Sequence, residues 1–202
     1  DNVIEVKRTM GKKGKMLLAI AAIVVVLGLV TALLRYNAIK TYTQYDVVSA
    51  TETSGDNIAD YTVFAGNVLK VTKDGASYID EKGVTKWDVS YAMKMPHAEV
   101  CGNYAIVADM NGKDVYVFNV DGEVSRQTLA YDISNVDIAE QGVYTLVLVG
   151  EDCNYINGYD KDSNTIYELK TTIDKSGYPM DIDISNDGQK LVTSYMKIQG
   201  TK

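Results

Sequence analysis

The clearest structural signal lies in the run Gly102-Asn-Tyr-Ala-Ile-Val107, which is followed by Val115-Tyr-Val-Phe-Asn119 and the turn Asp121-Gly122. Alternating side chains, β-branched and tyrosine residues, and an Asp-Gly turn are typical of antiparallel strands joined by hairpins. The same order of glycine, strand, tyrosine-rich strand and turn starts again at Gly66-Asn-Val-Leu-Lys-Val and at Gly142-Val-Tyr-Thr-Leu-Val, with a further start at Gly188. These glycines are 36, 40 and 46 residues apart, so the chain contains a β repeat.

Four strands in roughly 40 residues are typical of one blade of a β-propeller. The predicted strands are residues 68–72, 77–80, 84–89, 104–108, 115–119, 143–149, 155–159 and 165–169, and a fourth short strand leads into each following glycine at 98–100, 136–138 and 181–184. We therefore predict an all-β propeller of about three blades and part of a fourth. The alternative is a β-sandwich whose strands are similar by accident.

Closure is a difficulty for this propeller, because propellers usually close with four to eight blades and open edge strands promote aggregation. We expect the chain to be an N-terminal fragment of a longer protein. The stretch Tyr45-Asp-Val-Val-Ser49 is a candidate outer strand that closes the last blade.

The predicted core consists of apolar side chains on these strands: Val68, Val71, Ile79, Trp87, Ile106, Val117, Leu146, Val147, Ile156 and Ile182. The segment Gly83-Val-Thr-Lys-Trp87 resembles the Gly-Lys-x-x-Trp docking element of quinoprotein-type propeller repeats. That resemblance implies that Trp87 packs between blades.

The first 40 residues predict a membrane anchor. Five basic residues lie within residues 1–15, and Met16 to Leu34 then run for 19 residues without a charge, roughly 28 Å of helix. A buried core helix would show a polar face, and a cleaved signal peptide has a shorter apolar region. By the positive-inside rule we predict a cytoplasmic basic tail (1–15), a transmembrane anchor (16–35), a juxtamembrane segment (36–60) and an extracytoplasmic partial propeller (61–202). The predicted location is thus the plasma membrane, with one span that contacts the lipid bilayer.

Composition excludes several classes of function. Residues 36–202 carry 14 basic and 25 acidic side chains, a net charge of −11, and the whole chain has a pI near 4.7. Nucleic acid is therefore not an expected partner, because phosphate contacts need clustered Lys and Arg. The chain has one histidine and two cysteines, which disfavours histidine-based catalysis and a disulfide-dense scaffold.

Several longer stretches resemble an uncharacterised family, a domain of unknown function, of single-pass, surface-facing propeller proteins of Gram-positive bacteria. They are Tyr131 to Gly142, Tyr155 to Asp162, Lys170 to Met180 and Ile184 to Tyr195. The basic tail and anchor fit the same family. The resemblance implies a topology and a fold, and it assigns no chemistry. More loosely, Ser185-Asn-Asp-Gly-Gln-Lys-Leu191 is similar to the Ser-Pro-Asp-Gly-Lys turn of WD40-like and TolB-like propellers.

The sequence contains no recognisable arrangement of reactive side chains, and we predict no catalytic, cofactor-binding or metal-binding residues. His97 is expected in an inter-strand loop without a catalytic role. Cys101, at the close of the first blade, and Cys153, in the third, are expected to be separate buried thiols. Asp160-x-Asp162-x-Asn164 matches the start of a calcium loop but lacks its later Gly and Glu, so turn-forming carboxylates are the better interpretation.

The predicted function is non-enzymatic: a membrane-tethered propeller that presents its loops to a protein partner or an envelope component. The loop candidates for such contacts are Tyr91, Met93, Met95, His97 and Tyr178. The alternative is a small-molecule or ion sensor, or a quinoprotein-like enzyme, with Asp109, Asp137 and Asp183 in a central channel. A third hypothesis, an assembly scaffold resembling the lipoprotein propeller of outer-membrane biogenesis, is disfavoured by the anchor.

Overall fold

The computed structural model describes residues 11–39, 47, 50 and 58–197, which fall into two units, residues 1–47 and 48–202. The first unit contains one helix, α1 (Lys12–Ile39), with no buried residue. Its one hydroxyl between residues 16 and 34, that of Thr31, donates to the Leu27 and Gly28 carbonyls inside the helix. The helix is long and apolar enough to cross a membrane, a property that it shares with signal sequences.

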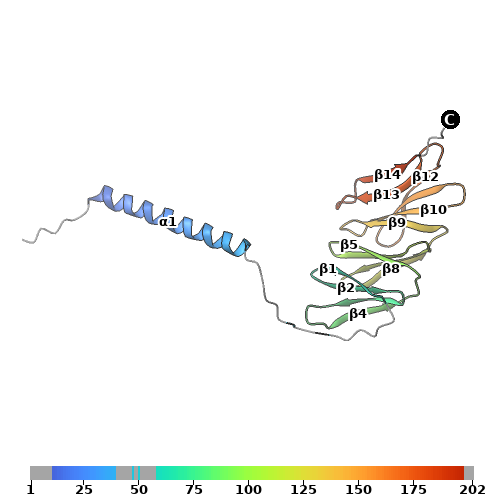
Figure 1. Ribbon diagram of the computed structural model, residues 1–202, viewed down its shortest axis with the longest axis horizontal. Helices are drawn as coiled ribbons and strands as arrows, with labels where there is room; N and C mark the ends of the chain where they lie inside the picture. The colour runs from blue at the N-terminus through green and yellow to red at the C-terminus, as the bar shows by residue number, and fades with distance from the viewer. Residues whose placement is uncertain (1–10, 40–46, 48–49, 51–57, 198–202) are drawn as a thin grey trace, which may run out of the picture. The chain divides into compact units, whose positions relative to one another are not determined.

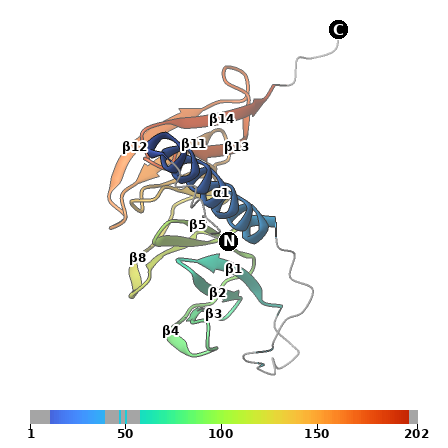
Figure 2. The ribbon, with the colours of Figure 1, turned by 90° about the vertical axis from the view of Figure 1, so that its left-hand side faces the viewer.

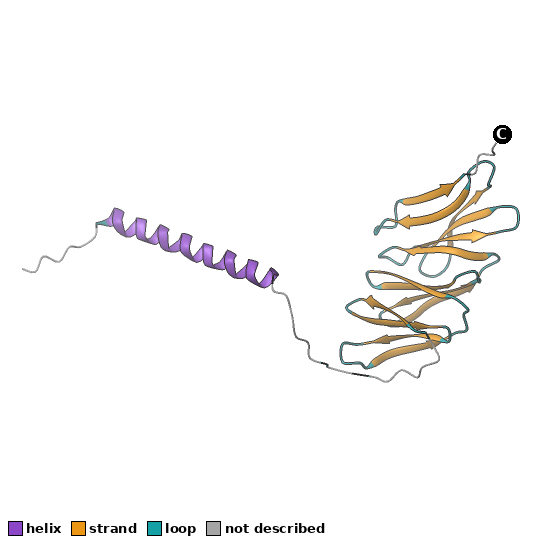
Figure 3. Ribbon diagram, viewed as in Figure 1, coloured by secondary structure: helices purple, strands orange, loops and turns teal. Residues whose placement is uncertain are grey.

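The second unit is built from antiparallel sheets that follow one another in chain order (Figures 1 and 3). The first sheet has the order β1 (Asp60–Phe64), β2 (Asn67–Thr72), β3 (Gly75–Ile79), β4 (Thr85–Ser90). The second has β5 (Pro96–Cys101), β6 (Tyr104–Asp109), β7 (Asp114–Asn119), β8 (Gly122–Thr128). The third has β9 (Asp132–Ile138), β10 (Tyr144–Val149), β11 (Asn154–Tyr159), β12 (Thr165–Thr171). The fourth is the hairpin β13 (Tyr178–Ile184) and β14 (Leu191–Met196).

The first strands of successive sheets lie side by side, β1 with β5, β5 with β9 and β9 with β13. Figure 2 shows the same succession of sheets from a second direction. This arrangement is that of propeller blades around a central axis, and it confirms the predicted all-β propeller of three blades and part of a fourth. The candidate closing strand, residues 45–49, lies outside the described residues except for Val47, which is not in a strand.

The predicted grouping of strands into blades is wrong by one strand. The strand that leads into each glycine opens a new sheet: β5 pairs with β6, and Cys101 lies opposite Tyr104. The reason is the tight turn at Gly102, whose φ of 57° suits glycine and returns the chain directly onto its neighbour. The first sheet opens likewise with β1, a strand that the sequence analysis did not identify.

The first and second sheets pack through aromatic side chains. The Trp87 ring lies between Tyr78 of its own sheet and Phe118 of the next, with ring centroids 5.5 and 5.1 Å away. Its indole Nε1 donates to the Val120 carbonyl at 3.2 Å. The prediction that Trp87 packs between blades is confirmed.

Two of the predicted core residues lie on the other face of the first sheet. Val68 and Ile79 are cross-strand partners and only half-buried, whereas the adjacent pair of Leu69 and Tyr78 is buried. Side chains alternate between the two faces of a strand, so Val68 and Val71 never shared a face. The other predicted core residues are buried, apart from the half-buried Trp87.

The second and third sheets are joined by apolar packing and by a polar chain. The Tyr144 hydroxyl accepts from Gln127 Nε2 at 2.6 Å and donates to Ser163 Oγ at 2.9 Å. Ser163 in turn contacts Ser125, whose hydroxyl donates to the Lys161 carbonyl at 2.7 Å. Burial raises the pKa of the Tyr144 phenol to about 12. These bonds fix the relative position of the two blades and hence of the loops at their ends.

Candidate functional site

The two ends of the blades differ in construction. At one end lie the turns between the second and third strands of each sheet and the longer connections between sheets; we call this end the connection face. It comprises residues 73–74, 91–95, 110–113, 129–131, 150–153 and 172–177. The opposite end, which we call the hairpin face, carries the turns between first and second and between third and fourth strands.

Four polar side chains on the hairpin face close its own turns. Asp80 Oδ1 accepts from the Lys82 and Val84 amides at 2.9 Å, and Asp160 Oδ1 accepts from the Asp162 and Asn164 amides at 3.0 and 2.8 Å. Asn119 and Asp187 form turns of the same kind. The sequence Asp160-x-Asp162-x-Asn164 is therefore a turn, as predicted. Within the described ranges 11–39 and 58–197, no acidic, His or Cys group has the arrangement of a metal site.

The connection face has a mostly apolar cavity of about 390 Å³ between the first and second sheets, which we call the first cavity. Met95, Pro96 and Met110 line it, together with Ile58, Val71, Asp60, Lys73, Lys94 and His97. Met95 is 56% exposed, and its carbonyl accepts from the Met110 amide at 2.9 Å. Methionine side chains adapt to varied partners, so this lining suits contact with apolar groups.

His97 reaches the same cavity from a strand rather than a loop, which corrects the sequence prediction. It is the second residue of β5 and pairs with Ala108. Its Nε2 lies 2.9 Å from Glu99 Oε1, two positions along the same strand and on the same face. Both side chains are exposed enough that the pair adds little stability.

Two of the other predicted contact residues belong to the core. Tyr91 and Met93 are 9% and 5% exposed and pack between the first and second sheets, with the Tyr91 ring against Tyr116. The Tyr91 hydroxyl has no hydrogen-bond partner among the described residues, and burial raises the pKa of this phenol. Tyr178 is the half-buried first residue of β13. Of the five candidates, Met95 and His97 are thus the ones that meet in a cavity.

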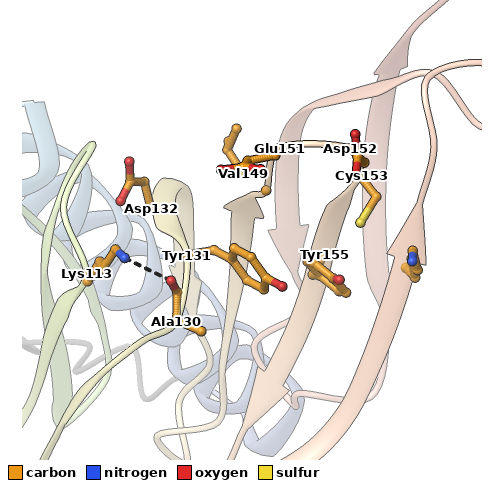
Figure 4. Close-up of a pocket in the computed structure, with 11 residues that line it drawn as sticks. Lys113, Ala130, Tyr131, Asp132, Val149, Glu151, Asp152, Cys153 and Tyr155 are labelled. Carbon is orange, nitrogen blue, oxygen red and sulfur yellow. Dashed lines mark hydrogen bonds between the residues drawn. The ribbon is translucent and has the colours of Figure 1, made fainter.

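A second cavity, of about 480 Å³, lies on the same face between the second and third sheets (Figure 4). Sequence analysis missed it, because its lining comes from four separate segments: Lys113; Ala130 to Asp132; Val149 to Cys153 with Tyr155; and Lys170. Tyr131 and Tyr155 stack, with ring centroids 4.9 Å apart and planes 16° apart. A Cβ on Gly150 would lie 2.7 Å from the Cys153 carbonyl oxygen, so the turn beside these rings needs glycine.

The polar groups of the second cavity are partly engaged. Lys113 Nζ donates to the Ala130 carbonyl at 2.9 Å, which ties the β6–β7 turn to the connection between the sheets (Figure 4). Hydrogen bonds with the Cys153 thiol and the Tyr131 hydroxyl raise the pKa of the Tyr155 phenol. The carboxylates of Asp132, Glu151 and Asp152 are on exposed residues around the opening.

The three acidic channel candidates have different roles. Asp109 ends β6, is 6% exposed, and accepts from the Lys94 and Met95 amides at 3.0 and 2.8 Å, so it shapes the connection face. Asp137 lies on β9 and Asp183 on β13, two first strands that lie side by side. Burial raises the pKa of Asp137, and the charge of Asp183 adds to this.

The repeats, the first-strand arrangement and the loop cavities define a β-propeller protein. The chain belongs to the Family of unknown function (DUF5711), whose model matches residues 38–202. Comparison with curated proteins found no match.

The solved structures that match this chain have low sequence identity to it. The structure of Hsv2 from Kluyvelomyces marxianus is 13% identical, with a TM-score of 0.55, over 78% of this chain and 52% of that one. Hsv2p from Kluyveromyces lactis is 13% identical, with a TM-score of 0.49, over 68% and 46% of the two chains. BamB from Moraxella catarrhalis is 14% identical, with a TM-score of 0.46, over 66% and 41%. The chain thus spans about half the length of the first Hsv2 structure, and this likeness concerns the fold alone.

Proposed function

We propose that the protein is a non-catalytic, membrane-anchored β-propeller that docks a protein partner on its connection face, outside the cytoplasm. The observation that carries the proposal is the contrast between the two ends. The connection face has two open cavities with exposed Met95 and Tyr131, whereas polar side chains such as Asp80 and Asp160 on the hairpin face are used to close its turns. Loops held by a rigid scaffold are the usual place for recognition.

Anchoring through Met16 to Leu34 is part of the proposal, as is a surface location on a Gram-positive cell. The charge-free run within α1 and the basic residues before it support this orientation. A reporter enzyme that functions only outside the cytoplasm should be active when it is fused after residue 202. Extraction with alkaline carbonate should leave the chain in the membrane. Release by carbonate, or an N-terminus removed by signal peptidase, would contradict the anchor.

The docking proposal is tested by photo-crosslinking in intact cells. A benzophenone amino acid replaces Met95 on the connection face or, as the matched control, the exposed Lys82 on the hairpin face. We expect a discrete heavier adduct from position 95 and none from position 82, and mass spectrometry identifies the captured protein. Equal adducts from positions 95 and 82 would overturn the proposal. So would the absence of an adduct both from position 95 and from a second probe placed at Asn111.

A further inference from the structure

The second cavity is large enough to hold a long side chain and has an aromatic lining. Its volume of about 480 Å³ lies in the range of small-ligand pockets, and the stacked rings of Tyr131 and Tyr155 form an aromatic wall. Tyr131 is 38% exposed, so part of its ring is available to a ligand. Such a wall suits the aliphatic stem of a long side chain.

The charges around this wall favour a cation. Figure 4 shows Asp132 on one side of Tyr131 and the Glu151–Asp152 turn on the other. Of the two lysines in the lining, Lys113 already donates to the Ala130 carbonyl, and Lys170 lies beside Tyr155 as its partner on β12. The lining thus carries three carboxylates and two lysines. Residues 36–202 as a whole have a net charge of −11.

We propose that the second cavity binds an arginine side chain of the partner protein, an inference that rests on the proposed docking function. The stem packs against Tyr131, and the planar guanidinium donates to carboxylates on both sides of the opening. A guanidinium has five N–H donors in a fixed plane and satisfies more than one carboxylate at once, which an ammonium group does less well. Lys170 repels a second positive charge at the Tyr155 end, so the site takes one basic residue rather than a basic run.

The test uses the full chain in nonionic detergent with tyrosine rings labelled with ¹³C. The probe is the blocked tripeptide acetyl-Gly-Arg-Gly-amide, and acetyl-Gly-Gln-Gly-amide is the neutral control. Tyr131→Phe and Tyr155→Phe assign the two ring signals. We expect saturable shifts of these signals with the arginine peptide and none with the glutamine peptide.

Charge variants separate this site from general attraction to an acidic protein. Glu151→Gln/Asp152→Asn should weaken binding about fivefold, in line with the loss of charge-assisted hydrogen bonds at an exposed site. Glu81→Gln/Asp121→Asn makes the same change in net charge with exposed residues of the hairpin face and should leave the affinity unchanged. Equal weakening by both pairs, no shift at saturating peptide, or equal binding of the glutamine peptide would each overturn the inference.

The outcome is independent of the crosslinking test at Met95. A partner captured from position 95 together with no arginine binding would leave the docking function standing and remove this site. Arginine binding together with no captured partner would leave the guanidinium site and remove its assignment to a docked protein.

Discussion

The carboxylate of Asp137 on β9 accepts a hydrogen bond of 2.6 Å from the backbone amide of Ile184 on β13, the first strand of the next blade. Its other oxygen accepts from the Ile138 amide at 2.8 Å. A charged group thus joins two neighbouring first strands at a half-buried position. Burial raises the pKa of Asp137, the two amide bonds lower it in part, and the nearby Asp183 and Glu99 raise it further.

This raised pKa predicts a specific dependence of stability on pH. Because the pKa of Asp137 is higher in the folded chain than in the unfolded one, its ionised form reduces the free energy of unfolding at neutral pH, and this loss is recovered as the pH falls through the folded pKa. Asp137→Asn imitates the protonated acid. We expect it to raise the free energy of unfolding at pH 7 by less than about 1 kcal/mol, since the site is half-exposed.

Urea unfolding at pH 7 and near pH 4 tests this expectation. The advantage of Asp137→Asn should shrink at the lower pH, and Asp132→Asn, at the exposed start of the same strand, should show no such trend. A variant that is less stable than the wild type by the same amount at both pH values would mean that the hydrogen bonds outweigh the cost of burial.

Trp87 supplies the second prediction, because its ring joins the first two blades. Trp87→Ala removes the contacts with Tyr78 and Phe118 and leaves a cavity, and we expect it to lower the free energy of unfolding by about 2 to 4 kcal/mol. Trp87→Phe retains an aromatic ring and should cost less than half as much. Urea unfolding monitored by circular dichroism measures the free energy of unfolding of both variants. Equal losses in the two variants would show that the ring stack is not the source of the stability.

The repeat was predictable from sequence because each blade contains its own local signals. Glycine, two-residue alternation and a tight turn recur on a length scale of a few residues, and Trp87 carried a recognisable docking pattern. The boundaries between blades were not predictable in this way. Whether 98–100 closes one sheet or opens the next depends on which strand pairs with β6, and the sequence gives both options the same alternation.

The site was harder to predict than the fold because it depends on contacts between distant segments. Met95 and His97 were identified as contact candidates and do line a cavity. Tyr91 and Met93 lie in the same short stretch and are residues of similar type, but they point into the core. Tyr131 and Tyr155 are 24 residues apart and meet only when the third sheet closes on its connection. Gly150 lies beside this contact, but it is required by its own turn, where a Cβ would meet the Cys153 carbonyl, so it does not mark the ring contact.

Gly158 on β11 provides a prediction about packing between strands. A Cβ at this position would collide with the ring of Tyr167 on β12, whose hydroxyl bonds to Thr145 Oγ1 at 2.8 Å. We therefore expect Gly158→Ala to displace Tyr167 and to lower the free energy of unfolding by about 1 to 3 kcal/mol. In the background Tyr167→Ala the same change should cost little, because the ring is gone. Additive losses in this double-mutant cycle would place the cost in the backbone instead.

The turn at Asp160 gives a prediction that separates a structural carboxylate from a calcium ligand. Hydrogen bonds from the Asn164 side chain and from backbone amides lower the pKa of Asp160. Its contribution to stability is therefore present above the unfolded pKa and lost as the pH falls through the folded value. Asp160→Ala should lower the urea midpoint at pH 7, and this loss should diminish in acid.

Asp162→Ala is the matched control, because the Asp162 side chain contacts only its neighbour Lys161 among the described residues. This variant should behave like the wild type. Added calcium should leave the midpoint of all three proteins unchanged, and a rise with calcium that is lost in Asp162→Ala would restore the metal interpretation.

The last prediction concerns Cys101, a free thiol that is half-buried at the end of β5, on the hairpin face, whereas the free thiol of Cys153 is buried in a turn of the connection face. Burial raises the pKa of Cys101, and the charges of Glu140 and Asp137 raise it further. Only the thiolate reacts with iodoacetamide. In the Cys153→Ser variant, Cys101 should therefore be alkylated at pH 8 roughly tenfold more slowly in the folded chain than in the same chain unfolded in urea. Glu140→Gln should speed the reaction of the folded chain, whereas Asp121→Asn, on a more distant turn, should not. A rate equal to that in urea would mean that this strand end opens readily. No effect of Glu140→Gln would leave burial and the charge of Asp137 as the causes of the raised pKa.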